Sequence, residues 1–297
     1  MARPPSGSRD YGSRGRFNDA QRGGPLALPE QPIGVFDSGV GGLTVLDECL
    51  AALPQEDFVY FGDTDWFPYG ERPPEELRAR ALAIGRWLVD QDAKLVVVAC
   101  NTAAAAALDV LQTTLPVPVI GVMGPESHAA VQSTRNRRVG LMATEATVAS
   151  GSYERMIHAY DAGVEVTSVA CPRLAPAIQG GDPYSETVVA LVREYTEPLL
   201  VAGVDTVILG CTHYPMVDKL LRRRLQGVAL VKSGEEIARE VGEGLMRRGL
   251  LRPPGAEGTY RFAASGDAGS FRDLGSRFLQ MPLGDVERVD PGVAVPA

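Results

Sequence analysis

Two short segments of this sequence repeat one pattern, in which an apolar run ends in a cysteine. Residues 95–99 (LVVVA) lead into Cys100, and residues 206–210 (TVILG) lead into Cys211. A continuous apolar run bounded by turn residues is typical of a parallel strand that is covered on both faces. Open α/β sheets place ligands at the carboxyl ends of such strands. The sequence therefore predicts two similar units that bring two thiols to equivalent positions.

Strand and helix patterns alternate along most of the chain. Strands are expected at residues 33–36, 58–61, 95–99, 117–122, 138–143, 164–170, 206–210 and 260–264. Helices are expected at residues 43–53, 74–90, 103–111, 147–161, within 183–201, at 233–248 and at 270–279. Such alternation predicts the α/β class, with two similar α/β domains built on mainly parallel sheets.

The composition along the chain also suggests domain boundaries. Residues 1–30 are rich in Arg, Gly, Ser and Pro and predict a disordered tail. We expect residues 31–125 together with 233–285 to form the first domain and residues 126–232 the second. Residues 286–297 are interpreted as a loose C-terminus.

Composition excludes several classes of protein. The 297 residues are 45% hydrophobic and 22% charged, as in a globular enzyme, and the net charge of −8 argues against a nucleic-acid binder. There is neither an apolar run of about 20 residues to span a membrane nor a secretion signal. Four cysteines without a C-x-x-C pair, and three histidines, argue against a zinc site and favour reduced thiols in the cytoplasm. The oligomeric state stays open, with a homodimer among the options.

The two strand-end cysteines are the first candidates for chemistry. A lone cysteine after a buried strand is usually a small core residue. Two in equivalent positions, Cys100 followed by Asn-Thr and Cys211 followed by Thr-His, favour a pair of acid–base thiols instead. Cys49 and Cys171 lack polar neighbours and are assigned to structure.

Two turns add polar candidates. Residues 37–42 (DSGVGG) allow the backbone to approach a ligand closely, although the spacing is not that of a dinucleotide-binding loop. Asp37 is a candidate acid or base there, with helix capping as the alternative. Residues 62–70 form a polar and aromatic turn in which Tyr69 offers a hydroxyl and Gly70 an N–H group to a ligand carboxylate, unless this is an ordinary surface loop.

The motifs together resemble those of a known family. They are FDSGVGGLT at residues 36–44, YFGDT at 60–64, PYG at 68–70, ACNTA at 99–103 and LGCTHYP at 209–215. In order and spacing they resemble the glutamate racemases, of the cofactor-independent amino-acid racemase superfamily, over residues 33–286. The resemblance implies an active site in the cleft between the domains, no pyridoxal phosphate, no metal, and production of D-glutamate for peptidoglycan.

The resemblance also implies roles for single residues. Cys100 would act on the proton of the D-enantiomer with help from Asp37, and Cys211 on that of the L-enantiomer with help from His213. Two such groups exchange the roles of base and acid when the direction reverses. The implied substrate-binding residues are Asp37, Ser38, Tyr69, Gly70, Asn101, Thr102, Thr147, Thr212 and His213.

The chain departs from the family pattern near Gln179, where a glutamate that helps the second thiol is usual. Residues 124–126 (GPE) and Ala104 depart as well, without removing a catalytic group. The alternatives are a racemase for aspartate or another amino acid and a catalytically impaired amino-acid-binding homologue. A cysteine hydrolase that uses Cys211 and His213 is a further alternative, but it would leave Cys100 without a role.

Overall fold

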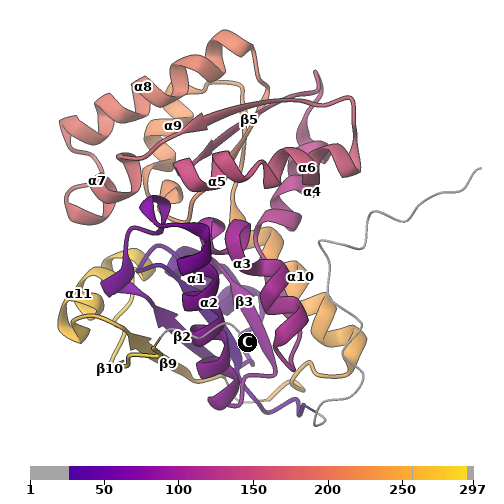
Figure 1. Cartoon of the computed structure of the whole chain (residues 1–297), viewed down its shortest axis with the longest axis vertical. Helices are drawn as coiled ribbons and strands as arrows, with labels where there is room; N and C mark the ends of the chain where they lie inside the picture. Colours follow the sequence, from indigo (N-terminus) through magenta and orange to yellow (C-terminus); the bar gives the residue numbers. More distant parts are fainter. Residues whose placement is uncertain (1–26, 256, 293–297) are drawn as a thin grey trace, which may run out of the picture.

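The strands form two separate parallel sheets, one in the lower half of Figure 1 and one in the upper half. The structure is a computed structural model that describes residues 27–255 and 257–292. The predicted class, α/β with two units built on mainly parallel sheets, is confirmed. Residues 1–26 of the predicted tail lie outside the described part of the chain.

The first sheet has six strands in the order β10-β9-β2-β1-β3-β4. Their bounds are β1 Ile33–Asp37, β2 Phe58–Gly62, β3 Leu95–Val98, β4 Val119–Gly121, β9 Tyr260–Ala264 and β10 Val286–Arg288. Val35 of the central strand is in register with Tyr60 on one side and Val97 on the other. Every residue of β1 is buried, which explains why its sequence is apolar on both faces.

Helices cover both faces of this sheet. They are α1 Leu43–Ala52, α2 Pro74–Asp90, α3 Asn101–Thr114, α10 Ser233–Arg248 and α11 Ala268–Leu279. Ile33 and Val35 pack with apolar residues of α1 and α10, whereas Phe36 packs with those of α2 and α3. The alternation of side chains along β1 thus places α1 and α10 on the face opposite to α2 and α3.

The second sheet has four strands in the order β6-β5-β7-β8. Its strands are β5 Arg138–Ala143, β6 Glu165–Ala170, β7 Thr206–Gly210 and β8 Ala229–Val231. Around it lie α4 Met123–Ser133, α5 Glu145–Ser150, α6 Ser152–Tyr160, α7 Leu174–Gly180, α8 Glu186–Ala202 and α9 Asp218–Arg224. Val207 and Leu209 pack toward α7 and α8, and Ile208 packs toward α4 and α6. This sheet is therefore also covered on both faces.

Three features differ from the sequence-based expectations. The helix expected at 147–161 is two helices, because Gly151 adopts a left-handed conformation (φ 62°) that ends α5. Helices α4, α7 and α9 and strand β8 were not expected. Val286–Arg288, expected to be part of a loose end, pairs with β9 as the edge strand β10. In the described residues no helix is both long and apolar enough to cross a membrane.

Candidate active site

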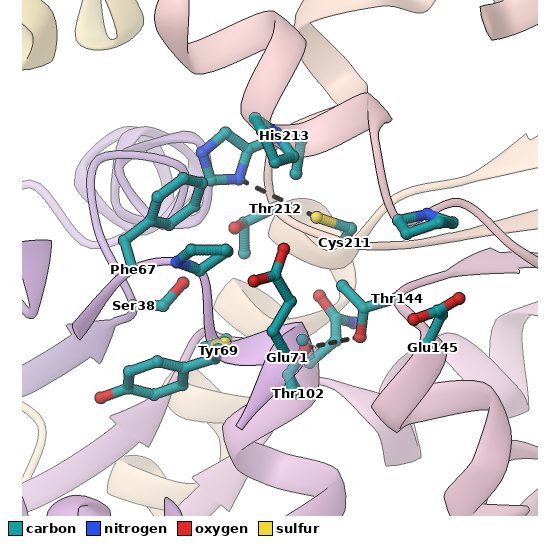
Figure 2. A pocket seen from close by; sticks show the side chains of 17 residues that line it. Ser38, Phe67, Tyr69, Glu71, Thr102, Thr144, Glu145, Cys211, Thr212 and His213 are labelled. Carbon is teal, nitrogen blue, oxygen red and sulfur yellow. Dashed lines mark hydrogen bonds between the residues drawn. The ribbon is translucent and has the colours of Figure 1, made fainter. Parts of the chain in front are cut away.

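A pocket opens where strands of both sheets end. Its walls include Ser38 after β1, Cys100 after β3, Thr144 after β5 and Cys211 after β7, so the two units face each other across it. Figure 2 shows Cys211, Thr212 and His213 above Thr102 and Tyr69 in this pocket. Its empty space, mouth included, is about 510 Å³.

Cys100 occupies the N-cap of α3. Its Sγ accepts a hydrogen bond from the backbone N–H of Ala103 at 3.4 Å. The helix therefore begins two residues earlier than the alanine run predicted, because the thiol itself supplies the cap. A helix N-terminus stabilises negative charge, so this position favours a thiolate when one forms.

Cys211 lies in the turn between β7 and the 3-10 helix η3 (Tyr214–Val217). Its Sγ is 3.9 Å from Nδ1 of His213. On the other side of the ring, Nε2 of His213 is 2.8 Å from Oε1 of Gln179. An amide oxygen only accepts, so Nε2 carries the hydrogen and Nδ1 offers its lone pair to the thiol. Gln179 thus orients the imidazole rather than touching the thiol.

Asp37 links the two halves of the site. Its Oδ2 accepts from the N–H of Gly39 at 3.0 Å, and its Oδ1 accepts from the hydroxyl of Thr212 at 3.2 Å. The hydroxyl of Thr44 in α1 reaches the carbonyl of Thr212 at 3.0 Å. These contacts hold the turn after β1 against the turn after β7.

Burial dominates the electrostatics of the pocket. It raises the pKa of Cys100 to about 12, that of Cys211 well above its ordinary value, and that of Asp37 as well. It lowers the pKa of His213 to about 4, so this imidazole is neutral at pH 7. A thiolate here needs compensating positive charge, and the ammonium group of an amino acid would bring it.

The hydroxyls of three threonines form one cluster, in which Thr102 and Thr144 line the pocket and the buried Thr147 does not. Thr102 and Thr147 each hydrogen-bond Thr144, both at 2.9 Å, and they lie 3.2 Å from each other. Thr144 also caps α5, a position at which a hydroxyl is favoured. The sequence analysis named Thr102 and Thr147 and missed Thr144, although it stands directly after the apolar strand β5.

Tyr69 and Gly70 line the pocket, but the hydroxyl of Tyr69 does not serve it. That hydroxyl donates to Asp63 at 2.5 Å, and Asp63 also pairs with the buried Arg80. The expectation that this hydroxyl is available to a ligand is therefore wrong. What remains for a ligand is the ring edge and the backbone around Gly70.

The remaining predicted residues also lie at this site. Ser38 and Asn101 are buried in the pocket wall. Cys49 and Cys171 lie in the apolar core. Beyond the prediction, Phe67 packs against the His213 ring, and Glu71 and Glu145 lie on the wall. Glu126, behind Asn101, was noted only as a departure, since nothing in its neighbouring sequence indicates a buried carboxylate.

Comparisons with known proteins agree with this geometry. Residues 33–241 match the family model described as Asp/Glu/Hydantoin racemase. A glutamate racemase of Geobacter metallireducens is 46% identical over 88% of this chain and 97% of its own. The crystal structure of the glutamate racemase isoform RacE1 of Bacillus anthracis superposes with a TM-score of 0.85 at 38% identity, over 88% of this chain and 98% of its own.

A structure determined with its ligand is similar too. The glutamate racemase of Francisella tularensis, solved in complex with D-glutamate, has a TM-score of 0.83 and 31% identity, over 89% of this chain and 99% of its own. The family model covers the residues that line the pocket, and both superpositions cover nearly nine tenths of this chain. The resemblance to glutamate racemases stated from the motifs is thus confirmed, and the chain belongs to the Asp/Glu/hydantoin racemase family of isomerases.

Proposed function

We propose that this protein is a glutamate racemase that interconverts L- and D-glutamate with Cys100 and Cys211 as its two acid–base groups. The observation that carries the proposal is that both thiols line one small pocket from opposite units. Inversion of an α-carbon needs a base on one face and an acid on the other. The sequence relatives and the structure with bound D-glutamate support glutamate as the substrate.

The reaction needs one thiolate and one thiol at a time. With L-glutamate, Cys211 as thiolate takes the α-proton and Cys100 as thiol delivers a proton to the opposite face. The enzyme is left with the thiolate on Cys100, which is the form that acts on D-glutamate. The neutral Nδ1 of His213, 3.9 Å from the Cys211 sulfur, would accept a hydrogen bond from this thiol and orient it toward the substrate, while its pKa of about 4 is too low for it to hold the thiol proton.

Charge develops on the α-carbon and its carboxylate in the transition state. Fixed donors in a water-poor pocket stabilise such charge best. The hydroxyl of Thr102 and the N–H groups at the start of α3 are the candidates beside Cys100, whereas the hydroxyl of Thr212 already donates to Asp37. Pro172, Ala175 and Pro176 of the same wall are apolar and exclude water. We place the enzyme in the cytoplasm, where it would supply D-glutamate for peptidoglycan.

Circular dichroism tests this function directly. Purified protein incubated with L-glutamate should lose the signal until it reaches zero, and D-glutamate should do the same from the opposite sign. Aspartate, run in parallel, tests the related substrate. In heavy water the α-proton should exchange for deuterium during turnover. Binding of glutamate without any exchange would instead show an amino-acid-binding homologue without activity.

A further inference from the structure

A buried carboxylate lies directly behind the turn that carries Cys100. Glu126 of α4 is fully buried and accepts hydrogen bonds from the hydroxyls of Tyr153 in α6 and Ser233 in α10. It also accepts from the side-chain amide of Asn101, with Nδ2 at 3.0 Å from Oε2. Three donors from three other helices therefore meet one carboxylate. The catalytic roles proposed above do not use this group.

These contacts determine which way the amide of Asn101 faces. Its NH₂ group has two hydrogens: one goes to Glu126 and the other to the hydroxyl oxygen of Tyr153 at 2.7 Å. Oδ1 is buried and has no hydrogen-bond partner among the described residues. Asn101 lines the pocket and directly follows Cys100. The one atom of this amide that is left without a hydrogen bond is thus an acceptor.

We propose that Glu126 is a positioning residue that turns the NH₂ group of Asn101 away from the pocket, so that its Oδ1 accepts a hydrogen bond from the ammonium group of the substrate. The proposal rests on the proposed function, because it takes the ligand to be an amino acid. A buried acceptor without a partner is unfavourable, and a ligand ammonium group satisfies it. The substrate carboxylates are excluded from this position, since they only accept.

The negative charge of Glu126 strengthens the arrangement. An NH₂ group that donates to a carboxylate carries more negative charge on its own carbonyl oxygen, because hydrogen bonds in a chain polarise one another. Burial raises the pKa of Glu126 to about 7, so the experiment is best done at pH 8, where the carboxylate is ionised. The carboxylate then accepts from the NH₂ group of Asn101 on the side away from the pocket, and the ligand donates to Oδ1 on the pocket side.

The variant Glu126→Leu tests the proposal by removing the acceptor with a side chain of similar size, whereas a glutamine amide could still accept from Asn101 through its oxygen and donate to Ser233. Without the carboxylate, the amide of Asn101 can turn over and present its hydrogens to the pocket. Binding is measured by titration calorimetry with racemic glutamate, whose composition turnover cannot change, and with glutarate, which is glutamate without its amino group. We expect Kd for glutamate to rise about 10- to 100-fold, the loss of one hydrogen bond to a charged group, while Kd for glutarate stays unchanged.

A second substitution should restore binding. Asn101→Asp in the Glu126→Leu background accepts from the hydroxyl of Tyr153, which has lost Glu126 as its acceptor, and leaves a second carboxylate oxygen for the ammonium group. We expect the preference for glutamate over glutarate to return. Tyr153→Phe, which removes one partner of the amide, should shift the preference in the same direction as Glu126→Leu, but less. Asp205→Asn is the control: this carboxylate accepts from Thr134 and the following backbone, away from the pocket.

The outcomes separate the possible failures. An unchanged ratio of the two Kd values in Glu126→Leu, or equal weakening of both ligands without rescue by Asn101→Asp, overturns the positioning role. If Glu126→Leu does not fold, an unchanged ratio in Tyr153→Phe overturns it. Wild-type protein that neither binds nor racemises glutamate contradicts the proposed function itself, before any variant is made.

Discussion

At the scale of single residues, the proposed chemistry depends on two thiols that burial keeps protonated. Cys100 and Cys211 expose 4% and 7% of their surface, and burial raises the pKa of both. The N-terminus of α3 favours a thiolate at Cys100, and a ligand ammonium group would favour one at either sulfur. In the proposed mechanism, catalysis at neutral pH therefore depends on the substrate itself to stabilise the thiolate.

Replacing either thiol with a hydroxyl should stop the reaction. In Cys100→Ser and Cys211→Ser we expect kcat to fall at least 100-fold, because a hydroxyl is a far weaker acid than a thiol. The assay is circular dichroism in both directions, with thermal melting to show that the fold persists. Cys49→Ala, which changes a core cysteine, should keep wild-type kcat. Retention of more than a tenth of the rate in either serine variant would contradict the two-base mechanism.

The neutral His213 should make stability depend on pH. Burial lowers its pKa to about 4, so the unfolded chain binds this proton more readily than the folded one. The contribution of the His213 imidazole to the free energy of unfolding is fully present above pH 6.5 and is lost as the pH falls toward 4. Integration from pH 7 to pH 5 gives a loss of about 2 kcal/mol.

Denaturant unfolding at pH 7 and pH 5 measures this loss. His213→Asn should lose less stability over that interval than the wild type does, because it lacks the titrating imidazole. Cys100→Ala is the matched control, since it alters the same pocket and leaves the imidazole in place. An equal loss in His213→Asn and wild type would show that the imidazole does not carry this pH dependence.

At the scale of elements, the turn between β1 and α1 has to pass very close to the turn after β7. A Cβ atom on Gly41 would lie 2.5 Å from both Nδ1 of His213 and Oγ1 of Thr212. Atoms at that distance overlap, so one of the two turns would have to move. The glycine here is required by the approach of the two units and not by its own backbone angles.

Gly41→Ala should therefore weaken catalysis more than stability. We expect kcat to fall about 10- to 100-fold, because displacement of catalytic groups by about 1 Å has effects of this size. Gly180→Ala at the end of α7 is the control, since a Cβ atom there meets nothing within 4 Å. The kinetic constants and Tm of both variants are compared. Equal kcat values in both would show that His213 and Thr212 tolerate the shift.

Much of the fold follows from local sequence. Strands β5, β7 and β9 have the predicted bounds, because continuous apolar runs bounded by turn residues identify buried parallel strands. Helix α4 was missed because it begins with Met-Gly-Pro, and glycine lowers helix propensity. Strand β8 is only three residues long and owes its conformation to pairing with β7. Such elements are formed by tertiary contacts that no local pattern records.

The candidate site could also be predicted only in part from the sequence. Motifs directly after strands revealed Cys100, Cys211 and their neighbours, because strand ends converge in an α/β sheet. The network of Glu126 could not be predicted, since its partners Tyr153 and Ser233 lie 27 and 107 residues further along the chain. The hydroxyl of Tyr69 was assigned to the ligand because Asp63 was not known to be beside it. Hydrogen-bond partners depend on folded geometry more than strand positions do.

At the scale of the whole molecule, the described residues contain both sheets and the residues that line the pocket. Among the described residues before β1, Pro29 makes a contact outside the pocket: its backbone carbonyl accepts a hydrogen bond from Lys94 at 2.5 Å. Lys94 also pairs with the buried Glu56. Pro29 thus contributes at the amino end of β3, whereas Cys100 follows the carboxyl end of this strand.

Two truncations test what the residues before β1 contribute to activity and to stability. Deletion of residues 1–26 should leave kcat, KM and Tm unchanged. Deletion of residues 1–30 should leave kcat unchanged but lower Tm by a few degrees, because the buried ammonium of Lys94 loses an acceptor. Calorimetric melting and the dichroism assay measure both. A fall in kcat on removing residues 1–26 would show that this segment contributes to turnover.

The strand order has a consequence for how the protein is made. Strand β2 ends at Gly62, but its outer neighbour β9 begins only at Tyr260, about 200 residues later. A ribosome adding 5–20 residues per second needs roughly 10 to 40 s to reach it. During that time the outer edge of β2 has unpaired backbone groups, and an unpaired strand edge invites pairing with other chains. The growing chain is therefore prone to aggregation through this edge from the time β2 leaves the ribosome until β9 has been made.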